Sequence, residues 1–222
     1  LGIDLGTSSV RATLVNPDGR PIATSAREYP VDSPHPGWSE QHPHTWWRAT
    51  CDVVASALTD AAQPNVCAIS FSGQMHGTVL CDANGEPVRS AIIWSDQRSL
   101  REVDAFRVKF GTERLAELTA NPLATGFQLA TLLWLRGNEL ESLDAARYVF
   151  LPKDWLRYRM TGVAATDPSD ACSTLMFDTA NRAWSDEVTG ALGIDRDKLP
   201  RVAESFELSG VLLPAAAREL GL

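Results

Sequence analysis

The chain has 222 residues, of which 44% are hydrophobic, and this suits one large globular domain or two small ones. Lysine and arginine number 20 against 28 acidic residues, so the formal net charge is −8 at pH 7. Because no basic run interrupts this acidic balance, the sequence argues against nucleic acid or an anionic membrane surface as a partner. No stretch approaches the ~18 consecutive apolar residues that a membrane span needs.

The N-terminus and the cysteines indicate where the protein works. The chain opens at Leu1 without a starting methionine and has neither the basic nor the apolar segment of an export signal. Its 4 cysteines are widely spaced and form no C-x-x-C pair, which favours free thiols in a reducing compartment. We therefore expect a cytoplasmic protein with some residues missing before Leu1.

The first third of the chain predicts a β-meander, a helix and a further strand. Asn16-Pro17-Asp18-Gly19 favours a tight hairpin turn, and apolar residues recur with helical spacing after residue 45. A short apolar run that stops at Gly73 predicts a buried strand. The expected elements are strands over 1–4, 10–15 and 21–29, a helix over 45–62 and a strand over 66–72.

From residue 78 onward, short strands alternate with helices. A second hairpin signal turns at Asn84-Gly85, Gly126 and Gly137 divide a helix-rich stretch, and a Ser/Thr/Asp-rich loop covers 166–174. A meander followed by this alternation predicts an α/β fold with a mixed central sheet flanked by helices. The expected elements are strands over 78–81, 91–94, 148–151 and 175–177, and helices within 99–140 and over 152–160 and 185–192.

The first candidate site is the turn Asp4-Leu5-Gly6-Thr7-Ser8-Ser9, which follows the first strand. A carboxylate, a glycine that allows close backbone approach and three hydroxyls suit a phosphate tail held with Mg²⁺. The metal belongs to this hypothesis because a carboxylate alone repels phosphate. The alternative is a polar β-turn in which Asp4 and Thr7 bond backbone donors.

The second candidate site is Ser72-Gly73-Gln74-Met75-His76-Gly77, directly after the expected buried strand. Ligands of open α/β sheets gather beyond the carboxyl ends of strands. Gln74 and His76 offer polar contacts to hydroxyl groups, and Met75 offers an apolar wall. Taken alone, His76 is better explained as a loop histidine bonded to a backbone carbonyl.

Other carboxylates favour structural explanations. Asp154 lies in the first turn of an expected helix, where the helix dipole stabilises negative charge. Asp167 and Asp170 suit Asx turns, and Asp96 is placed to pair with Arg98. A serine hydrolase is disfavoured because no Gly-x-Ser-x-Gly elbow is present.

Several short motifs follow one another along the chain: Gly2-Ile3-Asp4-Leu5-Gly6-Thr7-Ser8, Trp38-Ser39-Glu40-Gln41, Gly73-Gln74-Met75-His76-Gly77, Trp94-Ser95-Asp96-Gln97-Arg98, Leu151-Pro152-Lys153-Asp154-Trp155-Leu156 and Thr166-Asp167-Pro168-Ser169-Asp170-Ala171. In this order, over essentially the whole chain, they resemble the FGGY carbohydrate kinases. The opening Asp-x-Gly-Thr is shared with the actin-like, ribonuclease H-like ATPases, so the resemblance implies a ribonuclease H-like fold. Gln-Met-His-Gly resembles the motif of the xylulokinase branch. The motif of the related glycerol kinases at the equivalent place resembles Gln-Arg-Glu.

The resemblance implies transfer of the γ-phosphate of MgATP to O5 of D-xylulose, in a cleft between two domains. ATP and Mg²⁺ are the implied cofactors, D-xylulose is the implied sugar, and a homodimer is a family-level expectation. The matching positions imply that Asp4 is a carboxylate that positions the metal and the phosphates. They also imply that Gly6, Thr7 and Ser8 bind the nucleotide and that Met75 and His76 bind the sugar.

The sequence departs from the family pattern at its C-terminus. The family's catalytic base is an aspartate in a Gly-Gly-Gly-Asp-Asn-Ala segment, which is expected just beyond Leu222. We therefore expect residues 1–222 to be an N-terminal sugar-binding domain, truncated at both ends. Without the C-terminal ATP-binding domain, these residues are predicted to be inactive on their own.

Three other functions compete with this interpretation. Related kinases of the family act on ribulose, gluconate or glycerol, and Met75-His76 argues against them. A non-catalytic sugar-binding module has no need of a phosphate cradle, so Asp4-x-Gly6-Thr7 argues against that function. A ribonuclease H-like nuclease needs clustered acidic ligands and a basic face, which the net charge of −8 disfavours.

Overall fold

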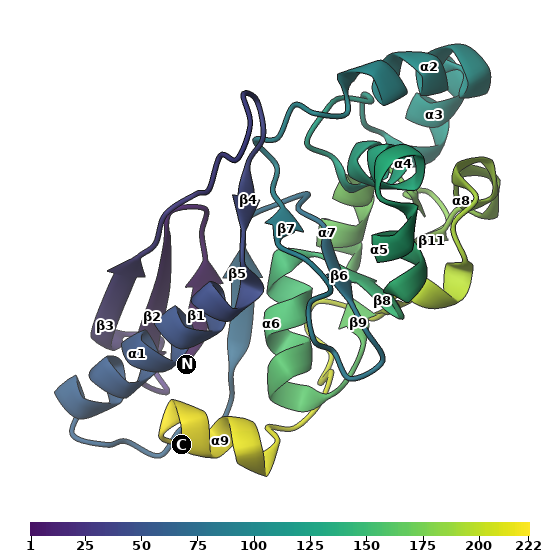
Figure 1. The fold of residues 1–222 in the computed structure, drawn as a ribbon. Coiled ribbons are helices and arrows are strands. Elements are labelled where there is room, and N and C mark those ends of the chain that lie inside the picture. The colour runs from purple at the N-terminus through teal and green to yellow at the C-terminus, as the bar shows by residue number, and fades with distance from the viewer.

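A four-stranded mixed sheet forms one side of the molecule (Figure 1). In the computed structural model, which describes residues 1–222, its strands lie in the order β3-β2-β1-β5. β1 pairs antiparallel with β2, and β2 with β3, whereas β5 lies parallel to β1. The predicted meander and mixed sheet are confirmed. The bounds are β1 Gly2–Leu5, β2 Ser9–Val15, β3 Pro21–Glu28 and β5 Ser70–Gly73.

One face of this sheet is covered and the other is open. Helix α1 (Pro43–Asp60) crosses β1, β2 and β3 in Figure 1. Side chains alternate along a strand, so Ile3 and Leu5 are buried on the covered face, whereas Asp4 is exposed on the opposite one. Arg11, the neighbour of Asp4 on β2, is also exposed. The sheet therefore presents a polar face to solvent.

A second core lies among the helices at the other end of the molecule. Leu129, Leu132 and Leu135 of one of these helices are fully buried there, so the predicted helix-rich stretch is confirmed. The predicted divisions hold approximately, because Gly126, with φ of 83°, precedes the helix over Gln128–Asn138 and Gly137 lies one residue before its end. A further break occurs at Gly111, with φ of 91°. The helices are α2 Leu100–Phe110, α3 Thr112–Thr119, α4 Gln128–Asn138, α5 Leu140–Ala145 and α8 Asp186–Leu192.

A two-stranded ribbon of β6 (Val79–Cys81) and β8 (Tyr148–Phe150) separates the two cores. Val79 and Cys81 belong to the core beneath the sheet, whereas Leu80 belongs to the helical core. Because alternate side chains enter different cores, both faces of the ribbon are buried. This ribbon joins the sheet and the helices into one structure.

Helix α6 and shorter elements complete the fold, and none of the helices combines the length and apolarity that crossing a membrane requires. The remaining elements are β4 Glu40–Gln41, β7 Ala91–Ile92, α6 Pro152–Thr161, β9 Ala165–Thr166, α7 Pro168–Ala171, β10 Phe177–Asp178, β11 Ala183–Trp184, β12 Arg201–Val202 and α9 Pro214–Leu220, with 3₁₀ turns at Cys172–Thr174 and Arg196–Lys198.

One prediction about a strand is wrong in a way that matters for the site, and a second is confirmed. The run over 66–72 is not a buried strand, because only Ser70–Gly73 is extended and β5 pairs with β1 alone. β5 is therefore an edge strand with one free side. The predicted hairpin signal at Asn84-Gly85 is confirmed, because the Asp82 N–H donates to the Glu86 carbonyl over 2.9 Å and antiparallel bridges join Thr78 to Ile92 and Cys81 to Pro87. The arms of this hairpin also pair elsewhere, β6 with β8 and β7 with β4.

The segment over 166–174 is more regular than the predicted loop. Asp167 caps α7 by accepting hydrogen bonds from the backbone of Ser169 and Asp170, and a 3₁₀ turn follows. Leu175 then adopts a left-handed conformation with φ of 63°, which ends the helical segment and delays the next strand. That strand is β10 and not the predicted 175–177.

Candidate functional site

The two predicted candidate loops begin side by side, at the carboxyl ends of the neighbouring strands β1 and β5. Leu5, the last residue of β1, lies opposite Gly73, the last residue of β5, in parallel register. The backbone N–H of Gln74 donates a hydrogen bond to the Leu5 carbonyl over 2.7 Å. The turn at 6–8 and the loop at 74–77 therefore leave the sheet in the same direction, as expected for ligand-binding loops of α/β sheets.

The turn at 6–8 is held by the chain around it. The Gly6 N–H donates to the Ser9 carbonyl over 2.9 Å, and a Cβ at Gly6 would meet that same oxygen at 2.9 Å. The Tyr29 hydroxyl donates to the Gly6 carbonyl. Burial, and after it the negative charge of Asp4, raises the pKa of Tyr29 above its ordinary value. Tyr29 is therefore a permanent hydrogen-bond donor that fixes this turn.

The groups at the tip of the turn remain available to a ligand. Asp4 is exposed and forms no hydrogen bond or ion pair, so it does not bond backbone donors as the β-turn alternative requires. The backbone N–H groups of Thr7 and Ser8 have no backbone acceptor, and Ser8 is exposed. Thr7 Oγ1 accepts a hydrogen bond from Trp94 Nε1 over 2.8 Å and keeps its own proton free to donate.

His76 lies in a constrained conformation in the second loop. Its φ of 64° is unusual for a residue other than glycine, and its ring lies 4.1 Å from the ring of Phe127, centroid to centroid. Its Nδ1 lies 3.0 Å from the Ser173 carbonyl oxygen, so the expected bond to a backbone carbonyl is present.

The surroundings of His76 fix its protonation. Burial lowers the pKa of His76 below its ordinary value, although the Ser173 carbonyl acts in the opposite direction. The ring is therefore neutral at pH 7. Because a carbonyl only accepts hydrogen bonds, Nδ1 carries the proton and Nε2 is left as an acceptor.

Met75 and Gln74 point in different directions. Met75 is 54% exposed and provides the expected apolar surface, whereas Gln74 is only 7% exposed. Gln74 Nε2 donates to Gln41 Oε1 over 3.0 Å, and Gln41 Nε2 donates to the Thr7 carbonyl over 2.8 Å. Gln74 therefore ties the two loops together and is not presented to a ligand, contrary to its expected contact with hydroxyl groups.

Trp94 lies beside the first candidate loop and is a further candidate residue, which the sequence analysis did not single out. Its side chain is 45% exposed and is anchored by the hydrogen bond to Thr7. The chain passes so close behind it that a Cβ at Gly126 would lie 1.9 Å from the Trp94 carbonyl oxygen. An aromatic residue at the end of an apolar run, followed by Ser95 and Asp96, was the signal available in the sequence.

The predicted ion pair between Asp96 and Arg98 is confirmed. Arg98 Nε lies 2.9 Å from Asp96 Oδ1, and Arg98 Nη2 lies 2.7 Å from Oδ2. The Ser39 N–H also donates to Asp96, and the Arg98 guanidinium stacks on Trp38 at 3.6 Å from the ring centroid. Asp96 is thus fully engaged and unavailable for proton transfer.

Asp154, Asp167 and Asp170 gather around the ammonium group of Lys153. The distances from Lys153 Nζ to their carboxylate oxygens are 2.9, 2.7 and 3.0 Å respectively. The predicted position of Asp154 in the first turn of α6 is confirmed, and so is the Asx turn at Asp167, whose carboxylate accepts from the Ser169 N–H. The Asp170 carboxylate contacts Lys153 and forms no Asx turn. Their shared partner, Lys153, was missed.

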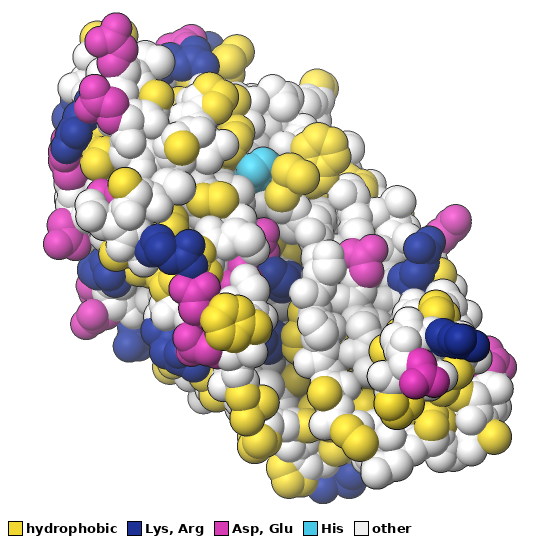
Figure 2. Space-filling model, turned by 180° about the vertical axis from the view of Figure 1, so that it is seen from behind, with side chains coloured by type: hydrophobic (Ala, Val, Ile, Leu, Met, Phe, Trp, Pro, Cys, Tyr) yellow, Lys and Arg dark blue, Asp and Glu magenta, His cyan; other side chains and the backbone are white.

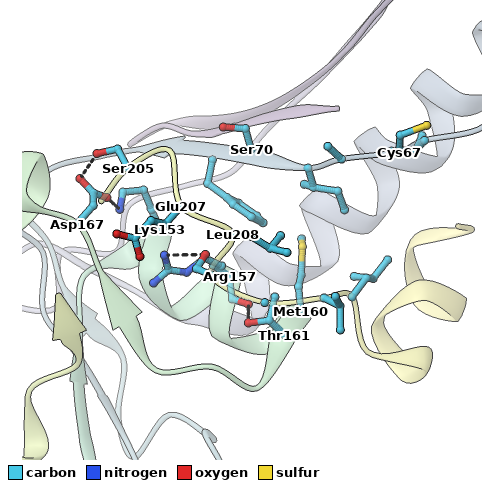
Figure 3. Close-up of a pocket in the computed structure, with 18 of the residues that line it drawn as sticks. Cys67, Ser70, Lys153, Arg157, Met160, Thr161, Asp167, Ser205, Glu207 and Leu208 are labelled. Carbon is cyan, nitrogen blue, oxygen red and sulfur yellow. Dashed lines mark hydrogen bonds and ion pairs between the residues drawn. The ribbon is translucent and has the colours of Figure 1, made fainter. Parts of the chain in front are cut away.

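A separate cavity lies along the free edge of β5 (Figure 3). Its volume is about 490 Å³, and Lys153, Asp167 and Ser205 meet at one end of it. Phe71 and Leu208 are among the apolar residues that line it. Neither candidate loop lines this cavity. The face of the molecule seen from behind shows a histidine beside hydrophobic side chains (Figure 2).

This fold and these paired loops match a known class of protein over the entire chain. Residues 1–222 match the family model described as "FGGY family of carbohydrate kinases, N-terminal domain". The chain belongs to the FGGY family of carbohydrate kinases.

Curated relatives that cover the whole of this chain include proteins named xylulose kinase. The chain is 41% identical over 223 residues to xylulose kinase of Escherichia coli (strain K12) and 38% identical over 224 residues to that of Bacillus subtilis (strain 168). These alignments cover 100% of this chain but 46% and 45% of the relatives. The chain thus spans about half the length of the curated relatives it matches.

A solved structure agrees with this assignment. The crystal structure titled as a "xyloylose kinase" from Brucella ovis superimposes with a TM-score of 0.94 at 35% identity, covering 100% of this chain and 46% of that one. The expected α/β fold and the resemblance to the FGGY kinases are both confirmed.

Proposed function

We propose that this chain is the sugar-binding part of a kinase that transfers the γ-phosphate of MgATP to D-xylulose, giving D-xylulose 5-phosphate. One observation carries the proposal. The parallel strands β1 and β5 end in register, so the turn that follows the exposed, unpaired carboxylate of Asp4 and the loop that carries the neutral imidazole of His76 leave the sheet side by side. The names of the relatives support the choice of D-xylulose.

Met75 and His76 form the proposed sugar side. A sugar presents hydroxyl groups that donate hydrogen bonds and C–H surfaces that pack on apolar atoms. His76 Nε2 is an available acceptor, and the exposed side chain of Met75 provides the apolar surface. Trp94 lies beside the turn and supplies a further flat apolar surface.

Asp4, Gly6, Thr7 and Ser8 form the proposed phosphate side. Mg²⁺ binds through one or two carboxylates together with water and phosphate oxygens, so the single free carboxylate of Asp4 fits such an ion. The free N–H groups of Thr7 and Ser8 and the Ser8 hydroxyl fit phosphate oxygens. When bound, the ion would neutralise charge on the phosphoryl group.

The proposed base and the second half of the nucleotide site belong to a longer protein. Apart from Asp4, the carboxylates that we singled out are paired with Lys153 or Arg98. The chain spans about half the length of the curated relatives it matches, and we propose that the base lies in the other half. The 222 residues alone are then expected to be inactive.

Location and assembly complete the proposal. The four free thiols are consistent with a reducing, cytoplasmic compartment. A homodimer is proposed from the family alone.

The proposal is tested by ADP release from MgATP over a panel of D-xylulose, L-ribulose, glycerol and gluconate, using the longer protein that carries this chain. We expect selective turnover of D-xylulose. Preference for another of these substrates would retain the family and discard the argument from Met75 and His76. Binding of a sugar without any turnover would favour a non-catalytic sugar-binding module.

A further inference from the structure

Lys153 is buried beneath the loop that carries His76, although neither its charge nor its length is explained by helix formation. The residue is 8% exposed, and its ammonium group is surrounded by the carboxylates of Asp154, Asp167 and Asp170. A buried cation with three partners is costly to desolvate, so it points to a purpose beyond local stability. Figure 3 shows its amino group directed toward Asp167.

One chain of contacts leads from Lys153 to the His76 ring. Lys153 Nζ contacts Asp170 Oδ2 at 3.0 Å, and the Ser173 hydroxyl donates to the Asp170 carbonyl over 2.6 Å. The carbonyl of Ser173 lies 3.0 Å from His76 Nδ1. Lys153 therefore holds the segment whose carbonyl decides which ring nitrogen of His76 carries the proton.

A second contact acts on the backbone of the same loop. The two glycines that bracket Gln74, Met75 and His76 lie against the first turn of α6. A Cβ at Gly73 would be 3.0 Å from Lys153 Cβ, and a Cβ at Gly77 would be 2.9 Å from Pro152 Cγ. Lys153 thus packs against the loop that carries His76. Through Asp170 it also holds the segment that carries the Ser173 carbonyl.

The charges around Lys153 reinforce this arrangement. Burial would lower the pKa of Lys153, but Asp154, Asp170 and Asp167 hold it above its ordinary value. Burial likewise favours the neutral form of Asp167, yet hydrogen bonds from Lys153 and Ser169 bring its pKa down to about 2. Lys153 and Asp167 therefore remain charged at every physiological pH.

We propose that Lys153 is a positioning residue for sugar binding. It fixes the segment 167–174 through Asp167 and Asp170, so that the Ser173 carbonyl keeps the proton of His76 on Nδ1 and leaves Nε2 to accept from a sugar hydroxyl. The part that concerns the sugar rests on the proposed function. The part that concerns the ring does not.

The first experiment records ¹⁵N chemical shifts of the His76 ring in the 222-residue chain without sugar. The wild-type ring is expected to carry its proton on Nδ1, and Lys153→Met is expected to shift the ring toward the Nε2–H form. Lys153→Arg keeps a cation among the carboxylates and is expected to restore most of the wild-type spectrum. The matched control is Lys198→Met, because Lys198 donates to the carbonyls of Leu143 and Ala146, both in the helical core.

The second experiment measures kinetics in the longer protein. Lys153→Met is expected to raise the KM for D-xylulose about tenfold or more while the KM for ATP changes little, because the sugar loop alone is misplaced. Should Lys153→Met fail to fold, as urea titration would reveal, Asp170→Asn breaks the same contact chain with less loss of charge. It is expected to shift the His76 resonances in the same direction.

Unchanged His76 shifts in a folded Lys153→Met or Asp170→Asn protein would overturn the proposal. So would equal increases in the KM for sugar and for ATP, which a general loss of structure would cause. If the wild-type protein did not use D-xylulose, the proposed function would fail while the ring measurement would still decide the role of Lys153.

Discussion

The carboxylate of Asp4 and the three carboxylates around Lys153 lie in opposite surroundings. Asp4 is exposed at the open face of the sheet and has no partner, whereas Asp154 is fully buried and contacts both Lys153 and Arg157. An unpaired carboxylate contributes nothing to folding and remains free for a cation or phosphate. A buried, paired one maintains geometry and is unavailable to a ligand. The contrast separates a group that is available to a ligand from groups that maintain the geometry of the site.

The largest expected effect follows from removing the free carboxylate. Asp4→Asn should lower kcat for sugar phosphorylation by about 10³-fold, because a group that stabilises transition-state charge is lost. Stability should change by no more than about 0.5 kcal/mol, since Asp4 has no partner to lose. Steady-state kinetics and thermal unfolding of the same preparation check both statements.

The matched control for Asp4 is Asp18→Asn, which removes an exposed carboxylate from the hairpin turn of the same sheet. It should leave kcat unchanged. Comparable loss of activity in both variants would show that the net charge of the sheet, and not the position of Asp4, matters.

The opposite result is expected for a buried carboxylate. Asp154→Asn should destabilise the chain by about 3 kcal/mol, because Lys153 and Arg157 lose a buried counter-charge. Urea unfolding measures this loss. The control Asp104→Asn breaks an exposed pair with Arg107 and should cost less than about 1 kcal/mol. Equal destabilisation by the two substitutions would contradict the distinction between buried and exposed carboxylates.

A smaller effect is expected at His76. Asparagine tolerates the left-handed backbone and can still donate to the Ser173 carbonyl, but it lacks an acceptor at the position of Nε2. His76→Asn should therefore raise the KM for D-xylulose about tenfold, or about 1.4 kcal/mol, with little change in kcat. Kinetics with the exposed control His35→Asn should match the wild type. A fall in kcat with an unchanged KM for D-xylulose would contradict the proposed role of His76 in sugar binding.

The smallest effect is a dependence on pH. The pKa of His76 lies below its ordinary value of 6.5, so Nε2 is an unprotonated acceptor at pH 7 and above. Sugar affinity should be constant there and should weaken as the pH falls below 6.5 and Nε2 gains a proton. Calorimetric titration of D-xylulose between about pH 5 and pH 8, on either side of the ordinary histidine pKa of about 6.5, measures this affinity. Tighter binding at low pH would contradict the neutral ring.

Local signals in the sequence were sufficient for much of the fold. The hairpin between β2 and β3 has its own turn residues, and α6 begins at Pro152 and ends before Gly162, as predicted. Long-range pairing was not encoded locally. β6 pairs with β8, which lies far along the chain, and the edge position of β5 depends on which strands pair with β1.

The site was predictable to a similar degree. Both candidate loops follow strands and were found by that rule, and the conformation of His76 and its bond to Ser173 required tertiary contacts. The local roles of Asp154 and Asp167 were correct. Their common partner could not be found, because the 167–174 segment meets α6 only in the folded chain.

In the proposed site, Asp4 acts on the phosphate and His76 binds the sugar. The most direct test compares D-xylulose phosphorylation by the longer wild-type protein with that of its Asp4→Asn and His76→Asn variants, while both substrate concentrations are varied. We predict that Asp4→Asn lowers kcat with a nearly unchanged KM for D-xylulose, and that His76→Asn raises this KM with a nearly unchanged kcat. The same change in kcat and KM for both variants would contradict the division of the site between the two loops.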